Sequence, residues 1–180
     1  VDQIARACNT MLEVTFERAD PILKPGTLFV SMNAAGSGFR VENCRFGPNR
    51  ARGFICNASY GEVIGCTFDR LESHGVLSRP SYQWLEGGAS RNVRFKDCTF
   101  IDCGVFFGVH REMLTTNECH RNIVFAGCRF KGARAKLEVQ CCTGLGLDAN
   151  TFDLPEDKAV VLRKVGGAMT RRVAYGAHPR

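Results

Sequence analysis

The chain has 180 residues, of which 44% are hydrophobic and 23% charged, and its formal net charge is +6. This length suffices for one domain with a hydrophobic core, and the composition excludes a disordered or collagen-like chain. No apolar run approaches the roughly 20 residues of a membrane-spanning helix, so we expect no membrane partner. The positive charge is scattered except near the C-terminus, and aromatic residues do not interleave with it. We therefore expect no nucleic-acid partner.

The first 35 residues are less regular than those that follow. Residues 11–16 and 27–31 have the apolar content of strands, and Pro21, Pro25 and Gly26 separate them as turn residues. We expect residues 1–35 to form one or more irregular coils ahead of the regular part of the fold.

From residue 36 the sequence repeats. Each copy has two apolar residues at alternate positions, then a small or polar residue, then Cys or Asn, then Thr or Arg, then Phe. The five copies are residues 39–46, 61–68, 93–100, 123–130 and 145–152. A second short apolar run follows each copy, at 53–55, 75–77, 104–106, 137–139 and 159–161. Each unit is therefore expected to be a strand, a tight corner and another short strand.

Strands this short bury their apolar side chains only when the units stack on one another. The repeat predicts an all-β fold, a right-handed parallel β-helix of about five to six coils over residues 36–165, with residues 166–180 as a tail or cap. Neighbouring coils lie ~4.8 Å apart, so equivalent residues form columns. We interpret the cysteines of one such column as free, buried thiols that replace Asn at a corner; a disulfide framework is the alternative. The column is Cys44, Cys66, Cys98, Cys128 and Asn150.

Two coils carry extra residues after the second apolar run, at 78–90 and 109–120. Insertions at equivalent points of adjacent coils emerge on one side and commonly build a binding face. Trp84 is expected either to stack on a sugar ring or to anchor its loop, and Glu86 to be either an acid or base or a solvated residue. His110 and His120 lack the pattern of further ligands that a metal site needs, so we expect neither a metal nor another cofactor.

Several segments are similar to glycoside hydrolase family 110, whose members are bacterial exo-acting α-1,3-galactosidases built on a parallel β-helix. The segments are Asn49-Arg-Ala-Arg52-Gly53, Trp84-Leu-Glu86-Gly-Gly88, Asn92-Val93 with Cys98-Thr-Phe100, His120-Arg-Asn-Ile123 and Gly144-Leu-Gly-Leu147 with Asn150-Thr-Phe152. The resemblance covers residues 36–153. It implies hydrolysis of a terminal α-galactose from a glycan, with inversion, by two carboxyl groups ~6.5–9.5 Å apart. It also implies a secreted or periplasmic bacterial protein.

The insertions and the resemblance together give the candidate site. Glu86 and Glu112 are the expected catalytic carboxylates, and Asp69 and Asp102, which follow the Phe of their coils, rank below them. The expected substrate-binding residues are Trp84, Arg52, His110, Arg111 and His74.

Two departures from the family pattern leave the function open. The chain lacks an Asp-Asp-Ala-hydrophobic-Asn stretch in an earlier coil, and Arg79-Pro80 stand where an Asp is usual. We expect a C-terminal portion of a longer enzyme or a relative whose activity has changed. The alternative is a non-catalytic glycan-binding or structural β-helix. A third possibility is a polygalacturonase or pectate lyase, since Ser73-His74-Gly75 resembles the polygalacturonase Gly-His-Gly, although the companion Asp pair is absent.

Overall fold

The computed structural model describes residues 3–6, 12–18, 20–27, 30, 35–80, 87–109 and 119–176. Nearly all of its regular structure is strand. The elements are β1 (Gln3–Arg6), β2 (Leu12–Thr15), β3 (Arg40–Glu42), β4 (Arg45–Phe46), β5 (Phe54–Ile55), β6 (Gly61–Ile64), β7 (Thr67–Asp69), β8 (Val76–Ser78), β9 (Arg91–Lys96), β10 (Thr99–Ile101), β11 (Val105–Phe107), β12 (His120–Ala126), β13 (Arg129–Lys131), β14 (Leu137–Asp148), β15 (Thr151–Phe152), α1 (Glu156–Ala159), β16 (Val160–Gly166), β17 (Met169–Arg171) and β18 (Ala174–Tyr175).

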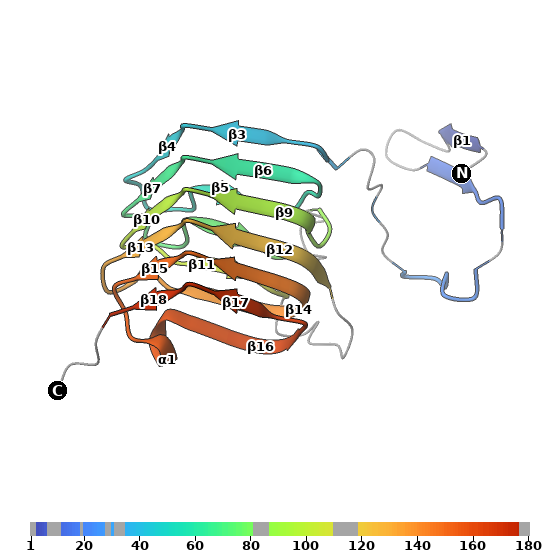
Figure 1. The fold of residues 1–180 in the computed structure, drawn as a ribbon. Coiled ribbons are helices and arrows are strands. Elements are labelled where there is room, and N and C mark those ends of the chain that lie inside the picture. Colours follow the sequence, from blue (N-terminus) through green and yellow to red (C-terminus); the bar gives the residue numbers. More distant parts are fainter. Residues whose placement is uncertain are drawn as a thin grey trace.

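Strands β3 to β18 form three parallel stacks that wind into a right-handed β-helix, which confirms the predicted fold class (Figure 1). The first stack runs β3, β6, β9, β12, the second half of β14, and β17. The second runs β4, β7, β10, β13, β15 and β18. The third runs β5, β8, β11, the first half of β14, and β16. Strands β1 and β2 pair antiparallel in a separate two-stranded sheet.

The core is a set of columns that run through the coils. In β9 the buried Val93 and Phe95 alternate with the exposed Arg94 and Lys96, the period that places every second side chain inside. The repeated Phe of the second stack forms a continuous aromatic column with ring centroids 4.3–5.5 Å apart, each pair worth ~0.5–1.5 kcal/mol beyond its buried area. The column is Phe46, Phe68, Phe100, Phe130, Phe152 and Tyr175.

The coils continue beyond residue 165, where the sequence analysis expects them to end. Met169–Arg171 pairs in parallel with β14, and Ala174–Tyr175 pairs with β15. The repeat is degenerate here, because Val173 stands in place of Cys or Asn and Tyr175 in place of Phe. Val173 and Tyr175 still pack against the core, so hydrophobic burial and ring stacking preserve the coil where the motif is lost.

The cysteine column works as a ladder of weak hydrogen bonds. The thiols of Cys66, Cys98 and Cys128 lie 3.4–3.7 Å from the carbonyls of Val41, Val63 and Phe95 in the preceding coil. Each thiol is also 3.4–3.7 Å from the carbonyl two residues before it in its own coil, so its one hydrogen is shared between two acceptors. Asn150 takes the next place and donates from Nδ2 to the equivalent carbonyl of Phe125 at 2.9 Å. The cysteines therefore replace Asn in size and reach the same carbonyl to which Asn150 donates.

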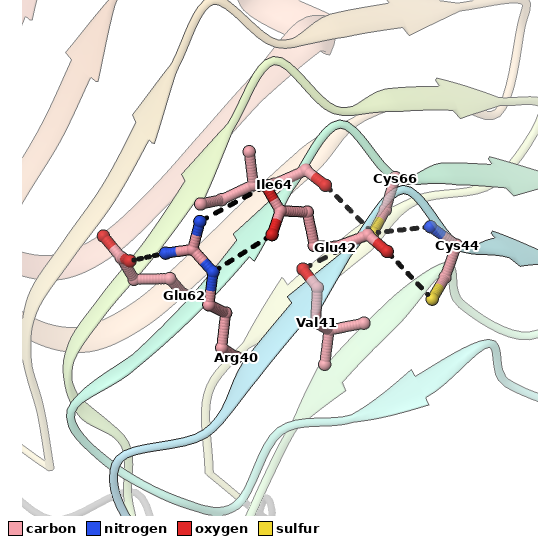
Figure 2. A network of polar contacts seen from close by, with 7 residues as sticks. All are labelled: Arg40, Val41, Glu42, Cys44, Glu62, Ile64 and Cys66. Carbon is pink, nitrogen blue, oxygen red and sulfur yellow. Dashed lines mark hydrogen bonds and ion pairs between the residues drawn. The ribbon is translucent and has the colours of Figure 1, made fainter.

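The four cysteines of the column form no disulfide, as predicted, and Cys8 lies outside the described part of the chain. Cys44 differs from the prediction because it is exposed. It belongs to the first regular coil, and Figure 2 shows it at the end of the ladder, where its backbone N–H donates to the Cys66 sulfur at 3.4 Å. Beside it, Arg40 holds Glu42 and Glu62 at 3.1 and 2.9 Å and so links the first two coils.

A buried network of hydrogen bonds joins the first and last residues of each insertion. The Ser90 hydroxyl donates to the Cys56 carbonyl at 2.6 Å, so the Ser78 hydroxyl, 2.8 Å away, donates to Ser90. This contact joins the two ends of the first insertion. The Nε2 of His120 lies 2.9 Å from the Gly108 carbonyl and joins the ends of the second.

His120 also connects the two insertions to each other. The Ser90 backbone N–H donates to its Nδ1 at 3.2 Å, so Nδ1 is unprotonated and Nε2 carries the hydrogen. The ring is fully buried and meets Phe107 edge-on at 5.6 Å. Burial lowers the pKa of His120, and no charged side chain in the described part of the chain contributes to this shift. Because both ring nitrogens are occupied within the fold, His120 is not available as a metal ligand.

Replacing Asn150 by alanine is expected to destabilise the fold strongly. The Cys128 N–H and the Phe125 carbonyl would both lose their partner, and each unsatisfied buried group costs ~1–3 kcal/mol. Asn150→Cys should cost less, because cysteine makes the equivalent bond elsewhere in the column. Urea unfolding at neutral pH measures both; an equal loss for the two variants would contradict the ladder interpretation.

The network at His120 predicts a loss of stability in mild acid. A lowered pKa means that the unfolded chain binds more protons than the folded one, so stability is complete above the ordinary histidine pKa of ~6.5 and declines as the pH falls through it. His120→Gln, which keeps one donor and one acceptor but does not titrate, should flatten this decline between about pH 7.5 and pH 5.

The control for this experiment is His74→Gln, because the pKa of His74 is also lowered and contributes with the same sign. Chemical unfolding of the wild type and both variants across the pH range separates the two contributions. A pH dependence in His120→Gln identical to that of the wild type would show that the network does not titrate.

Candidate functional site

One corner of the β-helix is shorter than its neighbours. Between the second and third stacks, eight positions separate Phe46 from Phe54, Phe68 from Val76 and Phe152 from Val160, and seven separate Phe130 from Leu137. Only five separate Phe100 from Val105. Because the strands on both sides stay in register, the missing residues leave the third regular coil recessed between the longer corners above and below it.

The recess is a hollow of about 360 Å³. Residues 71–74 of one coil form one wall, residues 102–104 of the short corner form the floor, and residues 133, 134 and 136 form the other wall. We call it the corner hollow. Its volume is at the lower end of the range for small-molecule sites.

Charged side chains without ion-pair partners surround the corner hollow. Glu72 lies on one wall and Arg134 on the opposite one, both exposed, and Asp102 is half-buried at the floor. In the described part of the chain none of these three forms an ion pair or a side-chain hydrogen bond. Asp102 lies against Gly132, where a Cβ would collide with its carboxylate. Lys136 is only loosely held, 3.8 Å from Glu138.

His74 stands at the rim of the corner hollow as a neutral ring. Burial lowers its pKa most, and the neighbouring cations Arg52, Arg79 and Lys136 lower it further, against the opposing effect of Glu138. Its Nδ1 lies 3.0 Å from the Ser73 hydroxyl, and the ring tilts over Phe106 with centroids 5.8 Å apart. A neutral imidazole beside unpaired carboxylates and cations can exchange hydrogen bonds with hydroxyl groups and can accept a proton.

Of the predicted site residues, the structure describes two. His74 lines the corner hollow, and Arg52 is exposed in the preceding coil, near enough to lower the pKa of the His74 imidazole. The other predicted residues lie outside the described part of the chain: Trp84, Glu86, His110, Arg111 and Glu112. For the insertions that carry them, the structure describes the bases, and the contacts at Ser90 and His120 bring these bases together.

The sequence analysis missed most of the residues around the corner hollow. It ranked Asp102 below Glu86 and Glu112 and did not consider Glu72, Arg134 or Lys136. It also treated the second apolar run as equivalent in every coil, without comparing its distance from the preceding Phe. The interval of five after Phe100 is the signal that was available, since a shortened corner in a stacked fold must leave a recess.

No helix in the described part of the chain has the length and apolar content to span a membrane. Comparison with curated proteins finds no match. Residues 24–152 match the family described as right handed beta helix region. This match covers more than half of the chain and agrees with the three parallel stacks. The chain therefore belongs to the right-handed β-helix family.

Proposed function

We propose that the protein is a carbohydrate-active β-helix that binds a sugar unit of a glycan in the corner hollow. The observation that carries the proposal is the recess at the short corner, which exposes two carboxylates, two cations and a neutral imidazole to one small volume. Sugars offer many hydroxyl groups that both donate and accept hydrogen bonds. Glu72 and Asp102 suit the donors, while Arg134 and Lys136 suit ring and hydroxyl oxygens. The partly exposed Phe106, next to His74, adds an apolar surface for the face of a sugar ring.

The resemblance to glycoside hydrolase family 110 favours a terminal α-galactose as the sugar and hydrolysis as the activity. The corner hollow precedes the third stack and the insertions follow it, so in that proposal the glycan extends from the hollow across β8 and β11. Glu86 and Glu112 then supply the acid and the base, and Trp84 and His110 contact the galactose. The contacts among Ser78, Ser90, Gly108 and His120 support it, because they hold the bases of both insertions together. The alternative is a β-helix that binds glycans without cleaving them, which the corner hollow supports by itself.

Binding at the corner hollow is expected to depend on its carboxylates. Glu72→Gln and Asp102→Asn each replace a charged acceptor, whose hydrogen bonds are worth ~1.5–3 kcal/mol, by a neutral one. Affinity for α-galactosyl oligosaccharides should fall by about tenfold or more in calorimetric titration. Glu156→Gln, on α1 at the corner of a later coil, is the matched control and should bind like the wild type. Unchanged binding in both hollow variants would exclude the corner hollow as the sugar site.

Hydrolysis is tested with an aryl α-galactoside and the wild-type protein. If Glu86 is the acid or base, Glu86→Gln should lower turnover by ~10²–10⁴-fold while binding persists. Trp84→Ala should mainly weaken binding. No hydrolysis by the wild type, together with retained oligosaccharide binding, would leave the non-catalytic alternative.

A further inference from the structure

We propose a second binding surface, distinct from the corner hollow: an anionic, linear polysaccharide binds along the outer face of the first stack, across β6, β9 and β12. Three of the cations concerned lie on one strand of six residues, and the fold places a fourth, from the next coil, beside them. We call it the basic face; it comprises Arg91, Arg94 and Lys96 on β9, Arg121 on β12, and the neighbouring Tyr60, Asn92 and Asn122.

Two arginines of the basic face are direct neighbours. Arg91 and Arg121 are paired in the register of β9 and β12, and both are exposed. Like charges at opposite positions of adjacent strands are destabilising. Neither arginine has an ion-pair partner in the described part of the chain, so none of the described residues relieves this repulsion. An external anion that contacts both guanidinium groups would relieve it.

The nearby carboxylates do not neutralise this face. Glu62 lies beside Arg94 in the register, but Arg40 holds its carboxylate at 2.9 Å (Figure 2). Asp97 is 4.0 Å from Lys96, a marginal contact between two exposed groups. Arg40 is shared by Glu42 and Glu62, so these two carboxylates and Asp97 leave the basic face and its neighbours with a surplus of two cations, whereas the two cations and two carboxylates of the corner hollow balance.

The spacing and chemistry of the face favour a glycan over a nucleic acid. Arg91 and Arg121 lie on adjacent coils at about 4.8 Å, close to the length of one sugar unit in an extended polysaccharide. Tyr60 is 62% exposed, and its backbone N–H donates to the Arg91 carbonyl at 2.8 Å, so it lies one coil from the arginine pair. One exposed aromatic beside the cations suits the apolar face of a sugar ring, whereas single-stranded nucleic acid uses successive stacking platforms. The Asn122 amide donates to Asn92 at 2.9 Å, and this pair adds polar groups beside the two arginines.

The test is a binding titration with four polymers: polygalacturonate, dextran sulfate, neutral galactan and a single-stranded oligonucleotide of matched charge. The first two separate carboxylate from sulfate as the source of the anion. We expect tight binding to at least one of them, weak binding to galactan and the oligonucleotide, and weaker binding as salt is added. Arg91→Gln with Arg121→Gln should reduce affinity by about tenfold or more. Tyr60→Asn, which suits the positive φ of this position, should reduce it less.

The matched control is Arg50→Gln with Arg163→Gln, which removes the same charge from exposed positions elsewhere on the chain. It should bind like the wild type. Equal weakening in both double variants, no binding of either anionic polysaccharide, or equal affinity for the oligonucleotide would each overturn the proposal. Glu72→Gln serves as a further control: it should spare polyanion binding, so failure at the basic face is separable from failure at the corner hollow.

Discussion

Parallel, in-register pairing of each coil with the next is the constraint on which the rest of the structure depends. Every strand of the three stacks pairs with the equivalent strand of a neighbouring coil. The neighbours of a side chain are therefore the side chains at the equivalent positions of the coils above and below it. The same residue type can occupy equivalent positions of successive coils only if its side chain packs well against another copy of itself. The flat stacking of Phe68 on Phe100, with rings 8° from parallel, is such a case. The Cys and Asn column is another, because its members after Cys44 reach a carbonyl of the coil before them.

The repeated part of the fold was predictable because the sequence shows this constraint directly. The alternation around Val93 and Phe95 and the recurrence of Phe every 22 to 32 residues indicate strands, stacks and columns without any knowledge of their packing. The exposure of Cys44 was missed because the motif is the same in every coil, whereas burial depends on whether another coil covers it.

The candidate site was predictable only in part, because it arises where repetition fails. The insertions were found from their added length, but the short corner after Phe100 is a local deletion and was overlooked. The charges of the corner hollow come from three coils, as do the neighbours of His74, so no short stretch of sequence contains them. The same holds for the arginine pair of the basic face, whose members are 30 positions apart.

The thiol ladder also has a consequence for the chemistry of the partly unfolded chain. The spacing of the coils places the Cα atoms of consecutive ladder cysteines within the range of separations found in disulfides. Burial and the direction of the side chains therefore keep these residues as thiols. Opening one end of the solenoid in an oxidising medium would expose sulfurs already aligned for cross-linking to the next coil. The row of sulfur atoms stops at Asn150, which donates a hydrogen bond to the equivalent carbonyl but contains no sulfur. The coils beyond Asn150 can therefore unfold and refold without forming a disulfide through this column.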